Sequence, residues 1–279
     1  MSKQTERKFK LSATALSTYL DSPKRFYFRY VMNLSPITLS TATYDHDRQF
    51  GIVWAEFTDR FYKGMGEAEN LKQTMDSWLE LTDWCPEKQR DALTKALTAL
   101  APMYYQMFNP EDGCRHPDKS EMWVENDRFC GKLDGLSSDG VIHEVKSTKH
   151  AQSLNDHLWK VQNSLQVRLY AVLAQATGSC IEFAYKDTPY SIFRGPVMPI
   201  EANQRALWEQ ELNVLADHIY SLGDDPYNYP CNPDGCCITS KFMNSICSYQ
   251  ILCEQGYTGD TELFFQKRIS HQDKQKGPK

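Results

Sequence analysis

The chain has 279 residues, of which 41% are hydrophobic and 12% aromatic, so a large core is possible and an intrinsically disordered chain is excluded. The net charge of −5 argues against a polycation that coats nucleic acid, although a local basic strip can still contact DNA. No apolar run reaches the roughly 18 residues of a membrane span, and residues 1–10 lack an apolar signal core. We therefore expect a cytoplasmic protein without a membrane partner, in which nine cysteines do not form a disulfide scaffold.

The first third of the sequence predicts helices. Residues 11–33 read as a helix capped by Ser12 or Thr14 and interrupted at Pro23, and residues 48–66 read as a second helix. Two amphipathic helices are expected further on, at residues 71–84 and 87–108. We interpret the region of about 67–110 as a helical insert, followed by a polar loop.

The middle and the end of the chain predict a sheet with further helices. Strand alternation begins at 121–129 and continues as a hairpin, for which Ser138-Asp139-Gly140 supplies the turn. The elements expected after the hairpin are a long helix at 154–177 ended by Gly178, strands at 180–186 and 190–198, an amphipathic helix at 201–222, and a polar, basic, disordered tail at 256–279. The apolar face of the 201–222 helix is predicted along Leu207, Val214, Leu215, His218 and Ile219.

The hairpin at 130–148 carries the residues with the clearest chemical meaning. Asp134 lies on its first strand, and Glu144 and Lys146 lie two residues apart on its second strand, so those two side chains share a face. Carboxylate oxygens suit Mg²⁺ or Mn²⁺. A lysine beside them can orient or deprotonate a water molecule, or stabilise charge on a phosphate. The hairpin therefore predicts a catalytic metal site.

Three motifs resemble the PD-(D/E)XK nuclease superfamily in its RecB-like exonuclease branch. They are Gly131-Lys132-Leu133-Asp134, then Glu144-Val145-Lys146 after the hairpin turn, and Gln166 followed four residues later by Tyr170. The resemblance implies an α/β fold with a restriction-endonuclease-like core, in which helices flank a mixed central sheet and a helical insert lies toward the N-terminus. It also implies one nuclease-like domain over residues 1–255.

The resemblance assigns roles to the hairpin residues. Asp134, Glu144 and the backbone carbonyl of Val145 are the implied ligands of Mg²⁺ or Mn²⁺, and Lys146 is the implied catalytic lysine. The superfamily helix that corresponds to 48–66 carries a histidine ligand where this chain has Ala55. Glu56 beside it is the candidate replacement, and a solvated glutamate or the absence of any helix-borne ligand is the alternative.

Four other residues are candidate DNA contacts by the same resemblance. Gln166 and Tyr170 border the active site in the superfamily. Lys24 and Arg25 belong to a segment that loosely matches its opening helix, and a solvated helix face is the alternative for both.

The cysteine-rich end at 230–253 resembles the iron–sulfur region of some relatives. Ser22 and Ser240 stand where two of the four cysteines are expected, and serine is a poor ligand for such clusters. We therefore expect that a cluster is not bound. The candidate ligands, for iron–sulfur or for zinc, are Cys231, Cys236, Cys237 and Cys247.

The function implied by the resemblance is a metal-dependent DNA exonuclease in recombination, repair, or phage or CRISPR DNA processing. Its DNA would be single-stranded or the ends of a duplex. Two alternatives stay open: a catalytically degenerate DNA-binding or scaffold subunit, and an endonuclease on the same fold. No G-x-x-x-x-G-K-[ST] phosphate loop is present, so unwinding would need a helicase partner, and a single-strand-binding or annealing partner is also conceivable.

Overall fold

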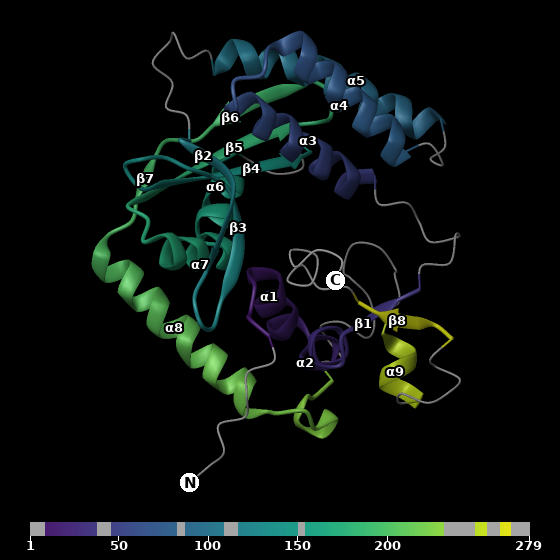
Figure 1. Ribbon diagram of the computed structural model, residues 1–279, viewed down its shortest axis with the longest axis vertical. Helices are drawn as coiled ribbons and strands as arrows, with labels where there is room; N and C mark the ends of the chain where they lie inside the picture. The colour runs from purple at the N-terminus through teal and green to yellow at the C-terminus, as the bar shows by residue number, and fades with distance from the viewer. Residues whose placement is uncertain are drawn as a thin grey trace, which may run out of the picture. The chain divides into compact units, whose positions relative to one another are not determined.

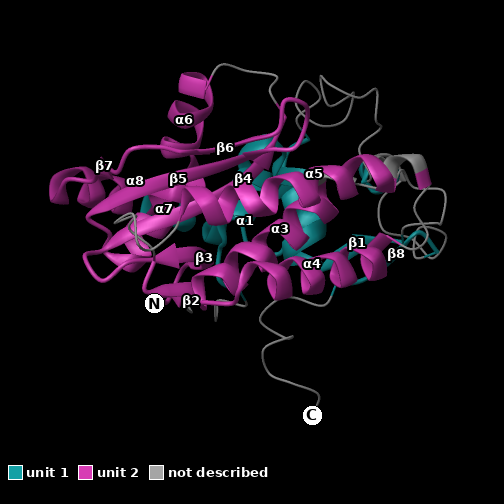
Figure 2. Cartoon of the chain, turned by 90° about the horizontal axis from the view of Figure 1, so that it is seen from above, with its two compact units in different colours: residues 1–42, 213–279 teal, residues 43–212 magenta. Residues whose placement is uncertain are grey.

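The computed structural model describes residues 9–37, 46–82, 87–108, 117–149, 154–231, 249–255 and 263–268. The chain separates into two compact units, coloured in Figure 2. One contains residues 43–212, and the other combines residues 1–42 with 213–279. The single nuclease-like domain over 1–255 stays a prediction.

A mixed sheet forms the centre of the 43–212 unit (Figure 1). Within the described residues its strand order is β2-β3-β4-β5-β6, and β7 also pairs with β5. Among the described strands of this sheet, only β4 and β5 run parallel to each other. The strands are β2 (Lys119–Glu125), β3 (Cys130–Leu136), β4 (Val141–Thr148), β5 (Gly178–Tyr185), β6 (Ser191–Arg194) and β7 (Met198–Pro199).

Three helices cover one side of this sheet: α3 (His46–Tyr62), α4 (Glu67–Thr82) and α5 (Glu87–Met107) (Figure 1). Their apolar faces pack together and onto β5 and β6 through a cluster rich in aromatic side chains. It includes Phe50, Trp54, Phe57, Phe61, Trp78, Tyr104, Phe108, Ala184 and Ile192. The predicted insert of 67–110 therefore consists of α4 and α5.

Two helices lie on the other side of the sheet, where the sequence predicts one (Figure 1). The expected helix of 154–177 is divided into α6 (Leu154–Gln162) and α7 (Leu165–Ala174). Ser164 causes the new start, because its Oγ accepts a hydrogen bond from the backbone N–H of Val167 at 3.3 Å and caps α7. The helix also ends earlier than predicted, at Gln175 in the left-handed conformation, and Gly178 begins β5 instead.

Helix α8 (Ala202–Ser221) crosses the boundary between the units. The predicted apolar stripe through Leu207, Val214, Leu215, His218 and Ile219 is correct only at Ile219, because Leu207, Val214 and His218 are exposed and Leu215 is half-buried. The buried positions of α8 are Trp208, Leu212, Ala216 and Ile219. Their spacing of three or four residues is regular, and Ile219 is the one position that they share with the predicted stripe.

The 1–42 and 213–279 unit pairs an early segment of the chain with a late one. It contains α1 (Ala13–Asp21), α2 (Pro23–Phe26), a π-helical turn (Tyr27–Val31), β1 (Leu34–Pro36), α9 (Gln250–Gln255) and β8 (Phe265–Lys267). Strand β8 pairs antiparallel with β1, so this part of the predicted disordered tail is ordered. No helix among the described residues is long and apolar enough to cross a bilayer.

Candidate active site

The predicted hairpin forms and places the acidic residues at its base. β3 and β4 pair antiparallel, with Gly135 opposite His143 and Leu136 opposite Ile142. Gly140 closes the turn with a φ of 83°, a conformation that glycine adopts without a Cβ penalty. Its N–H donates to the carbonyl of Ser137 at 2.9 Å. This pairing sets Asp134 and Glu144 beside each other on neighbouring strands.

Asp134 is held by the backbone of the strand that carries the other two residues. Its Oδ2 accepts a hydrogen bond from the N–H of Val145 at 2.8 Å. The backbone pairing of β3 with β4 ends at Gly135 and His143. The side chain of Asp134 therefore accepts the hydrogen bond of the Val145 N–H in place of a backbone carbonyl. The bond fixes the Asp134 carboxylate next to Glu144.

Glu144, Lys146 and Gln166 form a closed set of hydrogen bonds. Oε1 of Glu144 accepts from Nζ of Lys146 and from Nε2 of Gln166. Nζ of Lys146 also donates to Oε1 of Gln166 at 3.2 Å. The amide of Gln166 therefore contacts both partners of the ion pair, and it reaches them because Ser164 starts α7 two residues earlier.

Tyr170 joins α7 to β3. Its hydroxyl lies 3.4 Å from Nε2 of Gln166 and accepts a hydrogen bond from the backbone of Lys132. Its ring packs against Gly131, where an added Cβ would stand 2.3 Å from Cε1 of the ring. The structure thus brings together Asp134, Glu144, Lys146, Gln166 and Tyr170.

Burial and like charge dominate the electrostatics of the two acids. Burial, followed by the charge of Asp134, raises the pKa of Glu144 to about 7. Burial also raises the pKa of Asp134, although Lys146 and the Val145 N–H oppose this shift. For Lys146, burial lowers the pKa, but the charges of Glu144 and Asp134 outweigh it and the net shift is upward. Lys146 is therefore an ammonium cation at neutral pH.

The donor set fits a hard divalent cation. The buried carboxylate of Glu144 and the half-buried carboxylate of Asp134 stand together, and these hydrogen bonds use Oδ2 of Asp134 and Oε1 of Glu144, which leaves Oδ1 and Oε2 outside them. Burial, followed by the negative charge of Asp134, raises the pKa of Glu144, so a cation beside the two carboxylates would favour the ionised form. Oxygen ligands and concentrated negative charge are what Mg²⁺ and Mn²⁺ bind.

Three other predicted site residues have partners elsewhere. Glu56 on α3 is exposed, and its Oε2 pairs with Arg60 at 3.1 Å. Nζ of Lys24 donates to the carbonyl of Pro226 at 2.6 Å, and Arg25 pairs with Asp21 at 3.2 Å. Lys24 and Arg25 belong to the unit that does not contain Asp134. Roles for these three residues, and for the Val145 carbonyl, stay predictions.

The cysteine-rich end lies almost wholly outside the described residues. Cys231 is described and exposed, whereas Cys236, Cys237, Cys247 and Ser240 lie outside. Ser22 is buried, and its Oγ accepts a hydrogen bond from the N–H of Arg25 at 3.2 Å. Serine at this position therefore serves as the N-cap of α2.

A second polar cluster, around Glu182, was not predicted from the sequence. The signal was present, because Glu182 is a charged residue in the otherwise apolar run of β5, where all eight residues are buried. A charge in such a strand needs partners. Those partners, His143 and Arg194 among them, come from other strands and could not be identified from β5 alone.

Comparison with known proteins identifies the family. The family model of the PD-(D/E)XK nuclease superfamily matches residues 10–254, so the chain belongs to this superfamily. The predicted family and the predicted mixed α/β fold are thereby confirmed. A search of curated proteins gave no significant match.

Two solved structures illustrate the likeness. A phage related exonuclease from Haemophilus somnus 129PT is 15% identical, with 46% of this chain and 70% of that chain covered and a TM-score of 0.34. A candidate exonuclease from Eubacterium rectale is 10% identical, with 100% of both chains covered and a TM-score of 0.46.

Proposed function

We propose that this protein is a divalent-cation-dependent DNA exonuclease that hydrolyses phosphodiester bonds from DNA ends. The observation that supports this most directly is the convergence of Asp134, Glu144 and Lys146, tied by hydrogen bonds between β3, β4 and the side chain of Gln166. Membership of a nuclease superfamily supports the same class of reaction. Recombination, repair, and phage or CRISPR DNA processing are the processes we propose for it.

Asp134 and Glu144 would hold Mg²⁺ or Mn²⁺, together with the carbonyl of Val145. When bound, the cation supplies an acidified water and a polarised phosphate. Asp134 suits this role because the Val145 N–H orients its carboxylate through Oδ2. Glu144 suits it because it is almost fully buried and ionises only near neutral pH, so cation binding and loss of its proton are linked.

Lys146 would act as a fixed positive charge. Its ammonium group lies between Glu144 and Gln166, and a third of the side chain is exposed, so a phosphate can approach it. In that position it would orient the attacking water and offset negative charge that develops on the phosphate. The upward shift of its pKa favours this electrostatic role over proton abstraction.

Gln166 and Tyr170 would position these groups and border the path of the DNA backbone. Gln166 holds both members of the Glu144–Lys146 pair, and Tyr170 fixes the helix that carries Gln166. Loss of either should lower the rate of hydrolysis more than it lowers the affinity for DNA.

The test is incubation of the purified chain with end-labelled single-stranded and double-stranded DNA, in Mg²⁺, in Mn²⁺ and in chelator, beside Lys146→Ala. We expect cation-dependent release of short products from the ends, and loss of that activity in the variant. A covalently closed circle serves as the second substrate. Cutting of the circle would make the protein an endonuclease, and cation binding without any cutting would make it a degenerate DNA-binding or scaffold subunit.

A further inference from the structure

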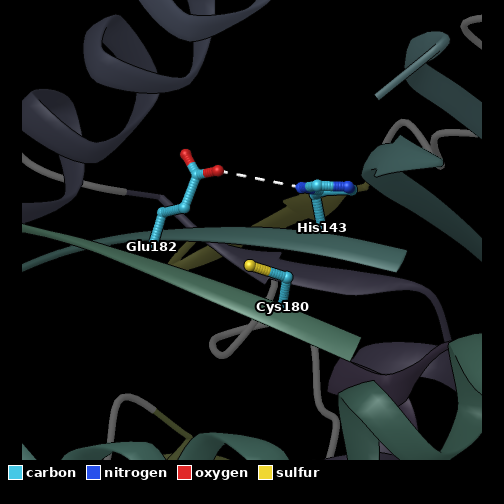
Figure 3. Close-up of side chains that lie close together, drawn as sticks. All are labelled: His143, Cys180 and Glu182. Carbon is cyan, nitrogen blue, oxygen red and sulfur yellow. Dashed lines mark ion pairs between the residues drawn. The ribbon is translucent and has the colours of Figure 1, made fainter. Parts of the chain in front are cut away.

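A second cluster of potential metal ligands lies on β4 and β5 (Figure 3). It contains His143 of β4 and Cys180 and Glu182 of β5, all buried, with ligand atoms that lie within 4.8 Å of one another. His143 stands opposite Cys180 in the parallel register, and Val145 stands opposite Glu182. Because strand side chains alternate, this cluster faces away from Glu144 and Lys146. Histidine, cysteine and carboxylate are the ligands that zinc prefers.

The guanidinium of Arg194 already contacts all three side chains. Its Nε donates to Sγ of Cys180 at 3.3 Å, and its Nη2 lies 3.3 Å from Nδ1 of His143. The same Nε lies 3.6 Å from Oε1 of Glu182. Arg194 reaches this position because β6 pairs antiparallel with β5 and places it directly opposite Glu182.

These contacts use the lone pairs that a metal would need. Arginine has five N–H donors and no acceptor, so the sulfur of Cys180 and Nδ1 of His143 must both accept. The proton of the His143 ring then resides on Nε2, which lies 3.2 Å from Oγ of Ser137. In this tautomer Nδ1, a potential metal-binding nitrogen, is directed at the guanidinium.

The negative charge of Glu182 balances Arg194. Oε2 of Glu182 accepts hydrogen bonds from the hydroxyls of Tyr62 at 2.9 Å and Tyr104 at 2.6 Å. Oε1 has no hydrogen bond and faces the guanidinium and His143. Burial alone would raise the pKa of Glu182, but its polar and charged neighbours hold the pKa below its ordinary value. The carboxylate of Glu182 therefore lies beside the guanidinium of Arg194 and offsets its charge.

We propose that the Arg194 guanidinium is the resident cation of this cluster and that the native protein binds no divalent metal there. A metal ion among the three ligands would stand beside a buried guanidinium, and like charges at such short range repel strongly in a protein interior. Removal of the guanidinium should convert His143, Cys180 and Glu182 into a metal site. This inference uses residues that the proposed nuclease site does not use, so either can fail without the other.

The experiment is titration with Co²⁺, read by the near-ultraviolet charge-transfer absorption of cobalt bound to thiolate. The chain has nine cysteines, so each spectrum is compared with that of the same chain carrying Cys180→Ala. We expect no Cys180-dependent band in the native chain. We expect Arg194→Ala to gain such a band, with one additional Co²⁺ bound per chain.

Two results would overturn the proposal. A Co²⁺–thiolate band in the native chain that disappears in Cys180→Ala would show that the cluster binds metal with Arg194 present. An Arg194→Ala chain that is folded by circular dichroism but gains no band would show that the guanidinium does not occupy the cation position. The native comparison decides the question even if Arg194→Ala does not fold, because Cys180→Ala leaves the Arg194–Glu182 pair in place.

Discussion

The ring of Tyr170 lies directly on the backbone of Gly131, with no room for a side chain between them. This contact seats α7 against β3. One helical turn before Tyr170, the side chain of Gln166 then meets Glu144 and Lys146. The glycine that stands three residues before Asp134 and the tyrosine that stands four residues after Gln166 are thus parts of one packing contact.

Gly131→Ala should destabilise the protein and impair the site. Its Cβ would stand 2.3 Å from Cε1 of Tyr170, whose ring is buried and held at its hydroxyl, so helix or strand must shift. We expect a loss of about 1–3 kcal/mol, the usual cost of overpacking. Thermal denaturation measures this loss, and the same substitution should cost much less in a Tyr170→Leu background.

Gly66→Ala is the matched control for that substitution. A Cβ at Gly66 meets nothing within 4 Å, and its φ lies outside the left-handed region. We expect a change within about 1 kcal/mol. Equal losses at Gly131 and Gly66, or a Gly131→Ala loss unchanged by Tyr170→Leu, would show that the packing contact is not what requires glycine.

Cation binding should weaken as the pH falls through about 7. The pKa of Glu144 is raised to about 7, so below that pH a proton competes with the cation for the carboxylate. At limiting Mg²⁺, the initial rate should fall roughly tenfold for each pH unit below the midpoint, and higher Mg²⁺ should move the midpoint to lower pH. A midpoint that does not respond to Mg²⁺ would contradict the role of Glu144.

Gln166→Glu sharpens the pH experiment. A second carboxylate beside Glu144 should raise its pKa further and move the midpoint upward by roughly one pH unit. Gln204→Glu adds the same charge at an exposed position of α8 and should leave the midpoint in place.

Glu144→Gln should stabilise the cation-free protein above pH 7. In the folded chain the pKa of Glu144 is raised from 4.5 to about 7. The stability that its protonated form contributes is complete below about pH 4.5 and is lost as the pH rises through about 7. We expect the melting temperature in chelator to rise by roughly 2–4 °C at pH 8, the shift that about 1 kcal/mol produces in a domain of this size. The difference should vanish near pH 4.5, and an equal difference at both pH values would refute the assignment.

Tyr104→Phe should cost more stability than Tyr105→Phe. The hydroxyl of Tyr104 donates to the buried carboxylate of Glu182 at 2.6 Å, whereas that of Tyr105 donates to the neutral carbonyl of Met65 at 2.6 Å. We expect about 1.5–3 kcal/mol for the charged partner and about 1 kcal/mol for the neutral one. Chemical denaturation of both variants measures the difference, and the reverse order would show that Glu182 does not depend on Tyr104.

The elements that the sequence predicted well have strong local signals. The hairpin with Gly140 at its turn and the helices α4 and α5 follow from strand alternation and helical periodicity, and the hairpin sets Asp134 beside Glu144, whose roles stay predictions. The break between α6 and α7 was missed because the apolar spacing continues across it, and only the capping hydroxyl of Ser164 reveals it.

Long-range relationships could not be read from one sequence. The pairing of β1 with β8 joins segments at opposite ends of the chain, and no local pattern in either strand identifies its partner. The same is true of Arg194, which meets His143 and Cys180 only because β6 lies beside β5 and β5 beside β4. The ion pair of Glu56 with Arg60 differs from these contacts, because two opposite charges four residues apart on one helix can be recognised in the sequence.

The most direct test of the central claim is hydrolysis of end-labelled linear DNA in Mg²⁺ by the native chain and by Asp134→Asn. Asparagine keeps the size of the side chain and can still accept from the Val145 N–H, but it removes the charge that would hold the cation. Asp91→Asn, at an exposed position of α5, is the control. The account predicts that Asp134→Asn loses roughly 10³-fold or more in rate and that Asp91→Asn keeps the native rate. An Asp134→Asn chain that cuts DNA as fast as the native chain would contradict it.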